Sequence, residues 1–270
     1  MKNNQNRSFD LIAIDCDGTL LNTDKTISEG AKEAIDQVKA AGLEVALITG
    51  RNLGGVTFIV SELGLDGLVV GCGGAVLYDI KTSWMIEWHH LPKDETAELI
   101  RLCRRQNALL VLENLEYSAY EKVVDEKESQ DRAAKFKNRK VEDLMQVLDE
   151  DPIKAVIVGE PGTIQAALAE IESLQLPFNL AMSGPNSVDI LAKGINKGSG
   201  LRALVSVRKI PLERIAVIGD WLNDLDMFKT SHFSIAMGNA PEELKAEADL
   251  VAPTNDEGGV AWALREIIRR

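Results

Sequence analysis

The 270-residue sequence contains only three cysteines, Cys16, Cys72 and Cys103, and no two of them are close in sequence. An odd number of separated cysteines argues against a disulfide scaffold and predicts a reducing compartment. Eight prolines and 21 glycines without a Gly-X-Y period exclude a fibrous chain. No stretch approaches the ~18 apolar residues of a membrane span, and the polar N-terminus is untypical of a secretory signal. We therefore expect a cytoplasmic protein with no membrane partner.

Positive charge is scarce, because 30 Lys and Arg stand against 42 Asp and Glu, which gives a formal net charge of −12. A chain this acidic is not expected to bind nucleic acid. A small anionic substrate remains compatible, since a metal ion or local cations can reverse the sign within one cleft. The P-loop spacing G-x-x-x-x-G-K-[ST] and the dinucleotide-binding pattern G-x-G-x-x-G are also absent.

Apolar residues make up 45% of the chain and charged residues 27%, which is ordinary for a globular protein. In the first 83 residues, short apolar runs that end in turn residues alternate with helical patterns. This alternation predicts buried strands of a parallel α/β sheet. The expected strands are 9–14, 43–49 and 68–70, and the expected helices are 28–42 and 57–63.

From about Trp84 the chain becomes aromatic and charged, and its apolar pattern changes. We expect strands at 109–112, 153–159, 178–182 and 187–191, helices after Asp94 and over 164–174, and a solvated polar stretch at 125–140. The α/β alternation then resumes, with expected strands at 215–219 and 233–237 and helices at 198–207, 224–229, 242–247 and 259–268. The sequence therefore predicts a doubly wound parallel-sheet core of residues 1–83 and 187–270, with an α+β domain of residues 84–186 inserted into it.

Two acids, Asp15 and Asp17, end the first expected strand. Burying charge there is unfavourable without a partner, so a purely structural role is a poor explanation. In an extended strand the two side chains would point in opposite directions, but Gly18 permits a turn that brings both into one cleft. A helix cap with a surface acid is the alternative.

A second acidic motif, GDWLND, directly follows the expected strand 215–219 and contains Asp220 and Asp224. Ligands of open parallel sheets bind at the carboxyl ends of the strands, where both motifs lie. Converging carboxylates repel each other unless a cation lies between them, and oxygen-only ligands favour Mg²⁺. Taken alone, this motif would also fit a capped helix.

Two further elements are suited to binding an anion. Thr49, Gly50 and Arg51 end the second strand, where a hydroxyl and free backbone N–H groups could hold phosphate oxygens. Lys197 precedes the helix expected at 198–207 and could supply a point charge to the same phosphate. A solvated lysine is the alternative.

These motifs occur in the order DCDGTLL, TGR, the lysine before a helix, and GDWLND. In this order they resemble the four motifs of the haloacid dehalogenase (HAD) superfamily of phosphohydrolases. The insert between the second and third motifs is similar to the C2B cap of the type IIB branch, the Cof-like sugar phosphatases. The tail segments AMGNAPEELKAEAD and TNDEGGVAWAL also resemble that branch, so the resemblance covers nearly the whole chain. It implies a Rossmann-like, HAD-like core under an inserted cap.

The sequence departs from the family pattern at Cys16, where Leu or Phe is usual, and at Gly73, where an Asn-Gly pair is common. Trp221 replaces a usual Gly or small residue beside the expected metal site. None of these changes removes a catalytic group, but Trp221 would narrow substrate access.

The resemblance implies a role for each motif residue. Asp15 would be the nucleophile that forms an aspartyl-phosphate, and Asp17 would be the general acid and base. Mg²⁺ would be held by the Asp15 side chain, the Asp17 backbone carbonyl and Asp220, with Asp224 close by. Phosphate would be held by Thr49, Gly50, Lys197 and Asn223, and Arg51 would reach the phosphate or the cap.

The leading hypothesis is therefore a Mg²⁺-dependent phosphatase of small phosphorylated metabolites, with sugar phosphates as the favoured class. A phosphotransferase or mutase, in which a sugar acceptor replaces water, is the nearest alternative. A non-catalytic phosphometabolite sensor is a third, but a sensor has no need of Asp15 as a nucleophile. Dehalogenation fits this sequence poorly, since the carbon–halogen hydrolases of the superfamily have no second acid at the position of Asp17 and need no Mg²⁺. The sequence carries no signal for an oligomeric state.

Overall fold

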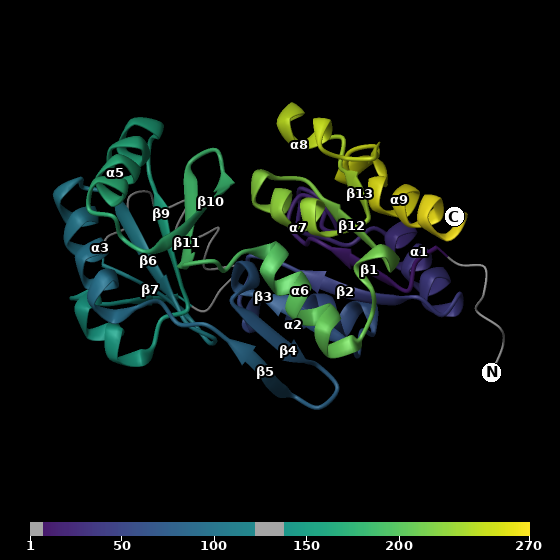
Figure 1. Ribbon diagram of the computed structural model, residues 1–270, viewed down its shortest axis with the longest axis horizontal. Coiled ribbons are helices and arrows are strands. Elements are labelled where there is room, and N and C mark those ends of the chain that lie inside the picture. Colours follow the sequence, from purple (N-terminus) through teal and green to yellow (C-terminus); the bar gives the residue numbers. More distant parts are fainter. Residues whose placement is uncertain (1–7, 122–137) are drawn as a thin grey trace.

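The computed structural model describes residues 8–121 and 138–270, whose strands form two sheets (Figure 1). The first sheet has the strand order β14 (Leu250–Val251), β13 (Phe233–Ala236), β12 (Ile215–Gly219), β1 (Leu11–Ile14), β2 (Glu44–Ile48), β3 (Leu68–Gly71), β4 (Val76–Asp79) and β5 (Trp84–Trp88). The second has the order β10 (Phe178–Gly184), β11 (Ser187–Ala192), β9 (Lys154–Val158), β6 (Leu109–Glu113), β7 (Ser118–Tyr120) and β8 (Asn138–Lys140).

Helices cover both faces of the first sheet. From β14 to β3 its strands run parallel, and only β4 and β5 are antiparallel. One face packs against α1 (Glu29–Ala40), α2 (Leu53–Leu63) and α9 (Gly259–Ile268). The other packs against α6 (Lys197–Arg208), α7 (Leu225–Thr230) and α8 (Glu242–Ala246). The doubly wound α/β core expected from the sequence is confirmed.

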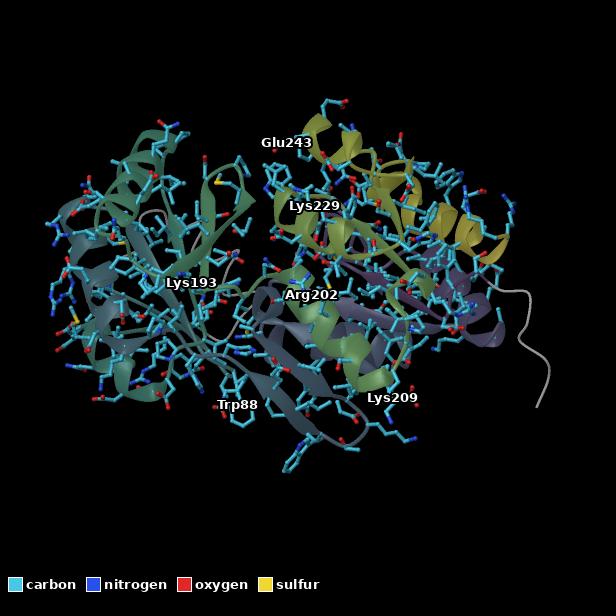
Figure 2. The ribbon with its side chains drawn as sticks, in the orientation of Figure 1. Trp88, Lys193, Arg202, Lys209, Lys229 and Glu243 are labelled. Carbon is cyan, nitrogen blue, oxygen red and sulfur yellow. The ribbon has the colours of Figure 1, made fainter. Side chains whose placement is uncertain are left out.

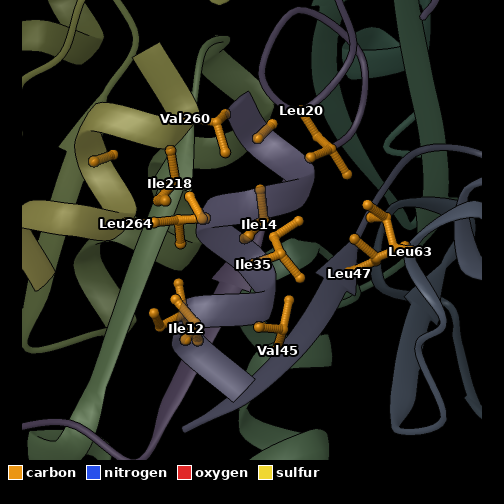
Figure 3. Packing of buried hydrophobic residues seen from close by; sticks show 14 of the residues in the cluster. Ile12, Ile14, Leu20, Ile35, Val45, Leu47, Leu63, Ile218, Val260 and Leu264 are labelled. Atoms are coloured by element: carbon orange, nitrogen blue, oxygen red, sulfur yellow. The ribbon is translucent and has the colours of Figure 1, made fainter. Parts of the chain in front are cut away.

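Strand β1 lies at the centre of this sheet, between β12 and β2. Its alternate residues point to opposite faces. Ile12 and Ile14 pack beneath α1 beside Ile35 (Figure 3), whereas Leu11 and Ala13 pack against the helices of the other face. Burial on both faces explains why this strand reads as a continuous apolar run in the sequence.

Side-chain caps set where two of the helices begin. Ser28 caps α1 as expected, because its hydroxyl accepts a hydrogen bond from the Ala31 N–H. Helix α2 begins at Leu53, four residues before the expected start, because the Asn52 side chain accepts a hydrogen bond from the Gly55 N–H. The apolar pattern of 57–63 marks only the part of α2 that faces the core.

Among the described residues, the helices of the second sheet lie on one of its faces. Helices α3 (Lys93–Arg105) and α5 (Pro161–Ser173) pack against alternate strand residues such as Leu112 and Ile157. Part of the polar stretch expected at 125–140 lies outside the described residues, and its last three residues form β8. None of the helices that the structure describes combines the length and the apolar character needed to cross a bilayer.

Strand pairing shows to which sheet the strands at the two expected boundaries of the insert belong. Strand β5 pairs with β4 in a hairpin and so belongs to the first sheet, although its aromatic composition suggested the insert. Strand β11 pairs with β9 and β10 and belongs to the second sheet. The chain therefore crosses between the sheets at 89–92 and 193–196. Trp84 and Trp88 on β5 are 69% and 49% exposed, so they contribute to the surface and not to the core of the insert. Figure 2 shows Trp88 at the surface.

Candidate active site

The sequence motifs converge at one edge of the first sheet. Because β12, β1 and β2 are adjacent and parallel, their carboxyl ends meet there. Asp220 follows β12, Asp15 follows β1, Thr49 follows β2, and Lys197 is the first residue of α6. All four line a cavity of about 200 Å³. The remaining predicted residues that line it are Asp17, Gly50, Arg51 and Asn223.

Lys197 holds two of the predicted carboxylates together. Its Nζ donates to Asp15 Oδ1 at 2.7 Å and to Asp224 Oδ1 at 2.5 Å. All three residues are at least 96% buried. Burial alone would lower the pKa of Lys197, but the charges of Asp15 and Asp224 outweigh it and raise the pKa. The lysine therefore remains charged, and it is not the solvated residue considered as an alternative.

Asp15, Asp220 and Asp224 form a compact group in which one carboxylate oxygen of each residue lies within 4.8 Å of the other two. Burial, aided by the charge of Asp224, raises the pKa of Asp15 to about 6 although Lys197 opposes it. Burial and then the charges of Asp15 and Asp224 raise the pKa of Asp220 to about 8. A divalent cation would offset this repulsion, and an oxygen-only donor set suits Mg²⁺. These residues therefore fit the predicted metal ion.

Gly18 allows Asp220 to approach the first motif. Gly18 has φ +80°, and a Cβ at this position would lie 2.2 Å from Asp220 Oδ2. The Thr19 hydroxyl donates to Asp220 Oδ1 at 2.8 Å. Any other residue at position 18 would therefore strain the backbone and displace this carboxylate.

Asp224 organises the loop after β12. Its Oδ2 accepts hydrogen bonds from the N–H groups of Asp220, at 2.9 Å, and Trp221, at 3.1 Å, while Oδ1 accepts from Lys197. This side chain is fully buried. Asp224 thus fixes the positions of Asp220 and Lys197 in addition to belonging to the compact carboxylate group.

Asp17 lines the same cavity, but its carboxylate is held by cations. Arg51 donates from Nε to Oδ2 at 2.6 Å and from Nη2 to Oδ1 at 2.8 Å. Lys25 lies 3.1 Å from Oδ1. Among the described carboxylates, Asp17 lies outside the compact group around Asp15. The role expected for the Asp17 backbone carbonyl in metal binding stays a prediction.

The loop after β2 is braced on both sides. The Gly73 N–H donates to the Thr49 carbonyl at 2.9 Å, and the Cys72 N–H donates to the Arg51 carbonyl at 2.8 Å. Thr49 Oγ1 accepts from the Arg51 N–H at 3.2 Å. These bonds fix the predicted anion-binding loop at the cavity wall.

A family model of haloacid dehalogenase-like hydrolases matches residues 12–264. The chain belongs to this family. The family expected from the four motifs is confirmed, and with it the expectation that the chain is an enzyme, a hydrolase. The type of fold, with an inserted α+β cap, is confirmed by its structural relatives as well.

This HAD-like hydrolase matches relatives over nearly its whole length. It is 30% identical over 260 residues to 5-amino-6-(5-phospho-D-ribitylamino)uracil phosphatase YitU of Bacillus subtilis, which covers 95% of this chain and 96% of the relative. It is 25% identical over 260 residues to pyridoxal phosphate phosphatase YbhA of Escherichia coli, with 93% and 96% covered. A crystal structure of a HAD-like hydrolase from Bacteroides thetaiotaomicron superposes with a TM-score of 0.85 at 28% identity, covering 96% of this chain and 99% of that one.

The charged residues that line the cavity of the hydrolase include three that the sequence did not indicate. Glu113, Lys154 and Asp189 lie on β6, β9 and β11 and line the cavity opposite the motifs. Each is at least 96% buried. Each is a charged residue within or at the end of an apolar strand. A charged residue in that position is expected to have a partner or a function, and this pattern could have indicated all three.

Proposed function

We propose that this hydrolase is a Mg²⁺-dependent phosphatase that releases inorganic phosphate from small phosphorylated metabolites, with sugar phosphates as the favoured class. The observation that carries the proposal is the buried pair of Asp15 and Lys197 in a cavity that also holds Asp220. A carboxylate nucleophile, a fixed cation and an oxygen-only metal site are what phosphoryl transfer requires. The phosphatase names of two relatives support the same reaction class.

The reaction proceeds in two steps. In the first, a carboxylate oxygen of Asp15 bonds to phosphorus while the bond from phosphorus to the leaving oxygen breaks, and Asp17 gives that oxygen its proton. In the second, water attacks phosphorus, the bond to Asp15 breaks, and Asp17 takes the proton of the water. The Asp15 side chain, the Asp17 backbone carbonyl and Asp220 would hold Mg²⁺, with Asp224 close by. When bound, this ion would neutralise negative charge on the phosphoryl group.

Substrate binding has to rearrange the Asp17–Arg51 pair. Asp17 can act as an acid only when it is protonated, yet both of its oxygens accept hydrogen bonds from Arg51. A phosphate dianion that enters the cavity takes the place of this carboxylate as partner of the guanidinium. Thr49, the Gly50 amide, Lys197 and Asn223 hold the remaining phosphate oxygens.

The second sheet and its helices act as a cap in this proposal. The cavity is lined both by the motifs of the first sheet and by Glu113, Lys154 and Asp189 of the second. Closure of such a cap excludes water and brings side chains to the leaving group. The cap extends between the two crossings, 89–92 and 193–196.

A cytoplasmic location and the absence of a nucleic-acid partner complete the proposal. The three cysteines are free and buried, as is usual for proteins of reducing compartments. The net charge of −12 disfavours contact with a phosphate backbone.

The test is phosphate release from a panel of phosphorylated metabolites, with Mg²⁺ and with EDTA. We expect turnover that needs Mg²⁺ and is lost in Asp15→Asn. Product analysis with a second sugar present separates hydrolysis from transfer. No phosphate release from any substrate, or release that persists in Asp15→Asn, would contradict the proposal.

A further inference from the structure

The cavity wall opposite the motifs is one face of the second sheet. Glu113 of β6 lies directly opposite Lys154 of β9 in the strand register. On the other side of β9, Asp189 of β11 lies opposite Val156 in the strand register. Its side chain accepts a hydrogen bond from Lys154, two positions before Val156 on β9. The residues next to them along each strand pack against α3 and α5. The side chains of Glu113, Lys154 and Asp189 therefore lie on the opposite face of the sheet.

Lys154 lies between the two carboxylates of this wall. Its Nζ lies 3.0 Å from Glu113 Oε2 and 3.3 Å from Asp189 Oδ2, and it donates to the Gly50 carbonyl at 2.7 Å. Two of its N–H groups donate to Gly50 and Asp189, whereas Glu113 Oε2 is its ion-pair neighbour and has no hydrogen-bond partner among the described residues. Burial would lower the pKa of Lys154, but the two carboxylates outweigh it and raise the pKa. Lys154 therefore stays charged, and its single positive charge is shared between two carboxylates.

The wall consequently presents negative charge and hydrogen-bond acceptors. Two carboxylates around one ammonium leave one uncompensated negative charge. Carboxylate oxygens can each accept more than one hydrogen bond, so Glu113 and Asp189 keep acceptor sites beyond those used by Lys154. Ser183 and Ser187 line the same cavity and add hydroxyl groups.

The other cations that line the cavity face the phosphate side. Among the described lining residues these are Arg51 and Lys197, which lie against Asp17 and Asp15. A substrate that brings its phosphate to them places its organic part against the negative wall. A second anionic group there meets a like charge. At about 8 Å and an effective dielectric constant of about 20, this repulsion changes relative affinity by more than tenfold.

We propose that Glu113 and Asp189 select phosphate monoesters whose organic part carries hydroxyl or ammonium groups, and that they reject those with a second anionic group. This inference rests on the proposed phosphatase function and narrows its substrate class. Lys154 is a positioning residue, since it holds both carboxylates and ties them to Gly50.

The test compares two substrates that differ only at the far end, glucitol 6-phosphate with a CH₂OH group and 6-phosphogluconate with a carboxylate. With the wild-type enzyme and Mg²⁺ we expect kcat/KM to favour glucitol 6-phosphate by roughly tenfold or more. The methyl ester of 6-phosphogluconate, which lacks the second charge, should recover most of this difference. Equal values for the first two substrates, or a methyl ester rejected as strongly as the free acid, would overturn the inference.

Variants locate the effect in the wall. Glu113→Gln should reduce the preference by roughly tenfold, and Asp189→Asn should act in the same direction if Glu113→Gln fails to fold. Glu172→Gln removes the same charge from the exposed side of α5 and should keep the wild-type preference. An unchanged preference in folded Glu113→Gln and Asp189→Asn would overturn the inference. Failure of the enzyme to hydrolyse any phosphate monoester, p-nitrophenyl phosphate included, would instead overturn the proposed function on which it rests.

Discussion

Lys197 and Asp15 form a buried ion pair across 182 positions of sequence, with Nζ and Oδ1 2.7 Å apart. The pair joins the start of α6 to the end of β1, so it links the two pieces of chain that flank the second sheet. Removal of one partner from a buried pair leaves the other charge uncompensated, which is far more costly than loss of a surface pair. The pair thus affects both the proposed chemistry and the stability of the core.

We expect Lys197→Met to lower the free energy of unfolding by about 3–5 kcal/mol in EDTA, because it leaves Asp15 and its neighbouring acids without their cation. Saturating Mg²⁺ should restore part of this loss. Urea unfolding with and without Mg²⁺ measures both effects. Lys193→Met, at an exposed lysine, is the matched control and should change stability little. A stability of Lys197→Met equal to wild type in EDTA would show that the pair contributes nothing.

Asp15→Asn should abolish turnover while leaving the fold intact, because the amide has the shape of the carboxylate but is a poor nucleophile. Phosphate release and the far-UV circular dichroism spectrum measure the two parts. Asp66→Asn, an exposed Asp, is the matched control. Borohydride reduction during turnover should also convert residue 15 of the wild type to homoserine. Turnover of Asp15→Asn within tenfold of wild type would remove this residue from the nucleophilic role.

Asp17→Asn should slow each half-reaction by roughly 10²–10⁴ and leave Mg²⁺ affinity nearly unchanged, since the Asp17 side chain lies outside the compact carboxylate group. Asp220→Asn should weaken Mg²⁺ binding. Calorimetric titration of Mg²⁺ and pre-steady-state kinetics at saturating metal compare the two variants. If Asp17→Asn lost only metal affinity, with unchanged chemistry at saturating Mg²⁺, the acid–base role would be wrong.

Replacement of residues 89–192 by a short Gly/Ser linker keeps β5 and removes the second sheet. The remaining chain should fold, bind Mg²⁺ and lose discrimination among phosphorylated metabolites more than affinity for free phosphate. The measurement is the spread of kcat/KM over one substrate panel for both proteins. An unchanged spread would place selectivity in first-sheet residues such as Trp221.

The buried thiols should resist alkylation in the native state. Burial, aided by Glu170, raises the pKa of Cys103 to about 12, and burial raises that of Cys72 likewise to about 12. At pH 8 both are thiols, and only the thiolate reacts. Iodoacetamide should label the native protein slowly and all three cysteines rapidly in guanidinium chloride, as followed by mass spectrometry. Rapid labelling of the native protein would contradict the burial.

The sequence predicts those parts of the site that follow from short-range patterns. Apolar runs that end in acids mark the ends of β1 and β12, and topology then brings Asp15 and Asp220 together. The pair of Asp17 with Arg51 is not visible in the same way, because it depends on side-chain conformation across two loops. The start of α2 was missed because the capping residue, Asn52, lies outside the apolar periodicity.

The insert was harder to delimit because sheet membership depends on long-range pairing. Composition changes at Trp84, whereas the chain leaves the first sheet only after Trp88. Glu113 and Lys154 are 41 positions apart in sequence and are adjacent only through the register of β6 and β9, so neither residue indicated the other. A charged residue inside a strand indicated that a partner was needed, but the sequence did not show which residue that partner was.

The position of β1 between β2 and β12 has a consequence for synthesis on the ribosome. Residues 11–14 emerge early, yet one of their two partner strands, at 215–219, emerges about 200 residues later. Until then, β1 presents an unpaired edge, and an unpaired edge is a site of aggregation. A chain that terminates before β12 would also lack Asp220. Truncated products are therefore expected to be both inactive and insoluble, so that chaperone demand during translation should extend until the last third of the chain has been made.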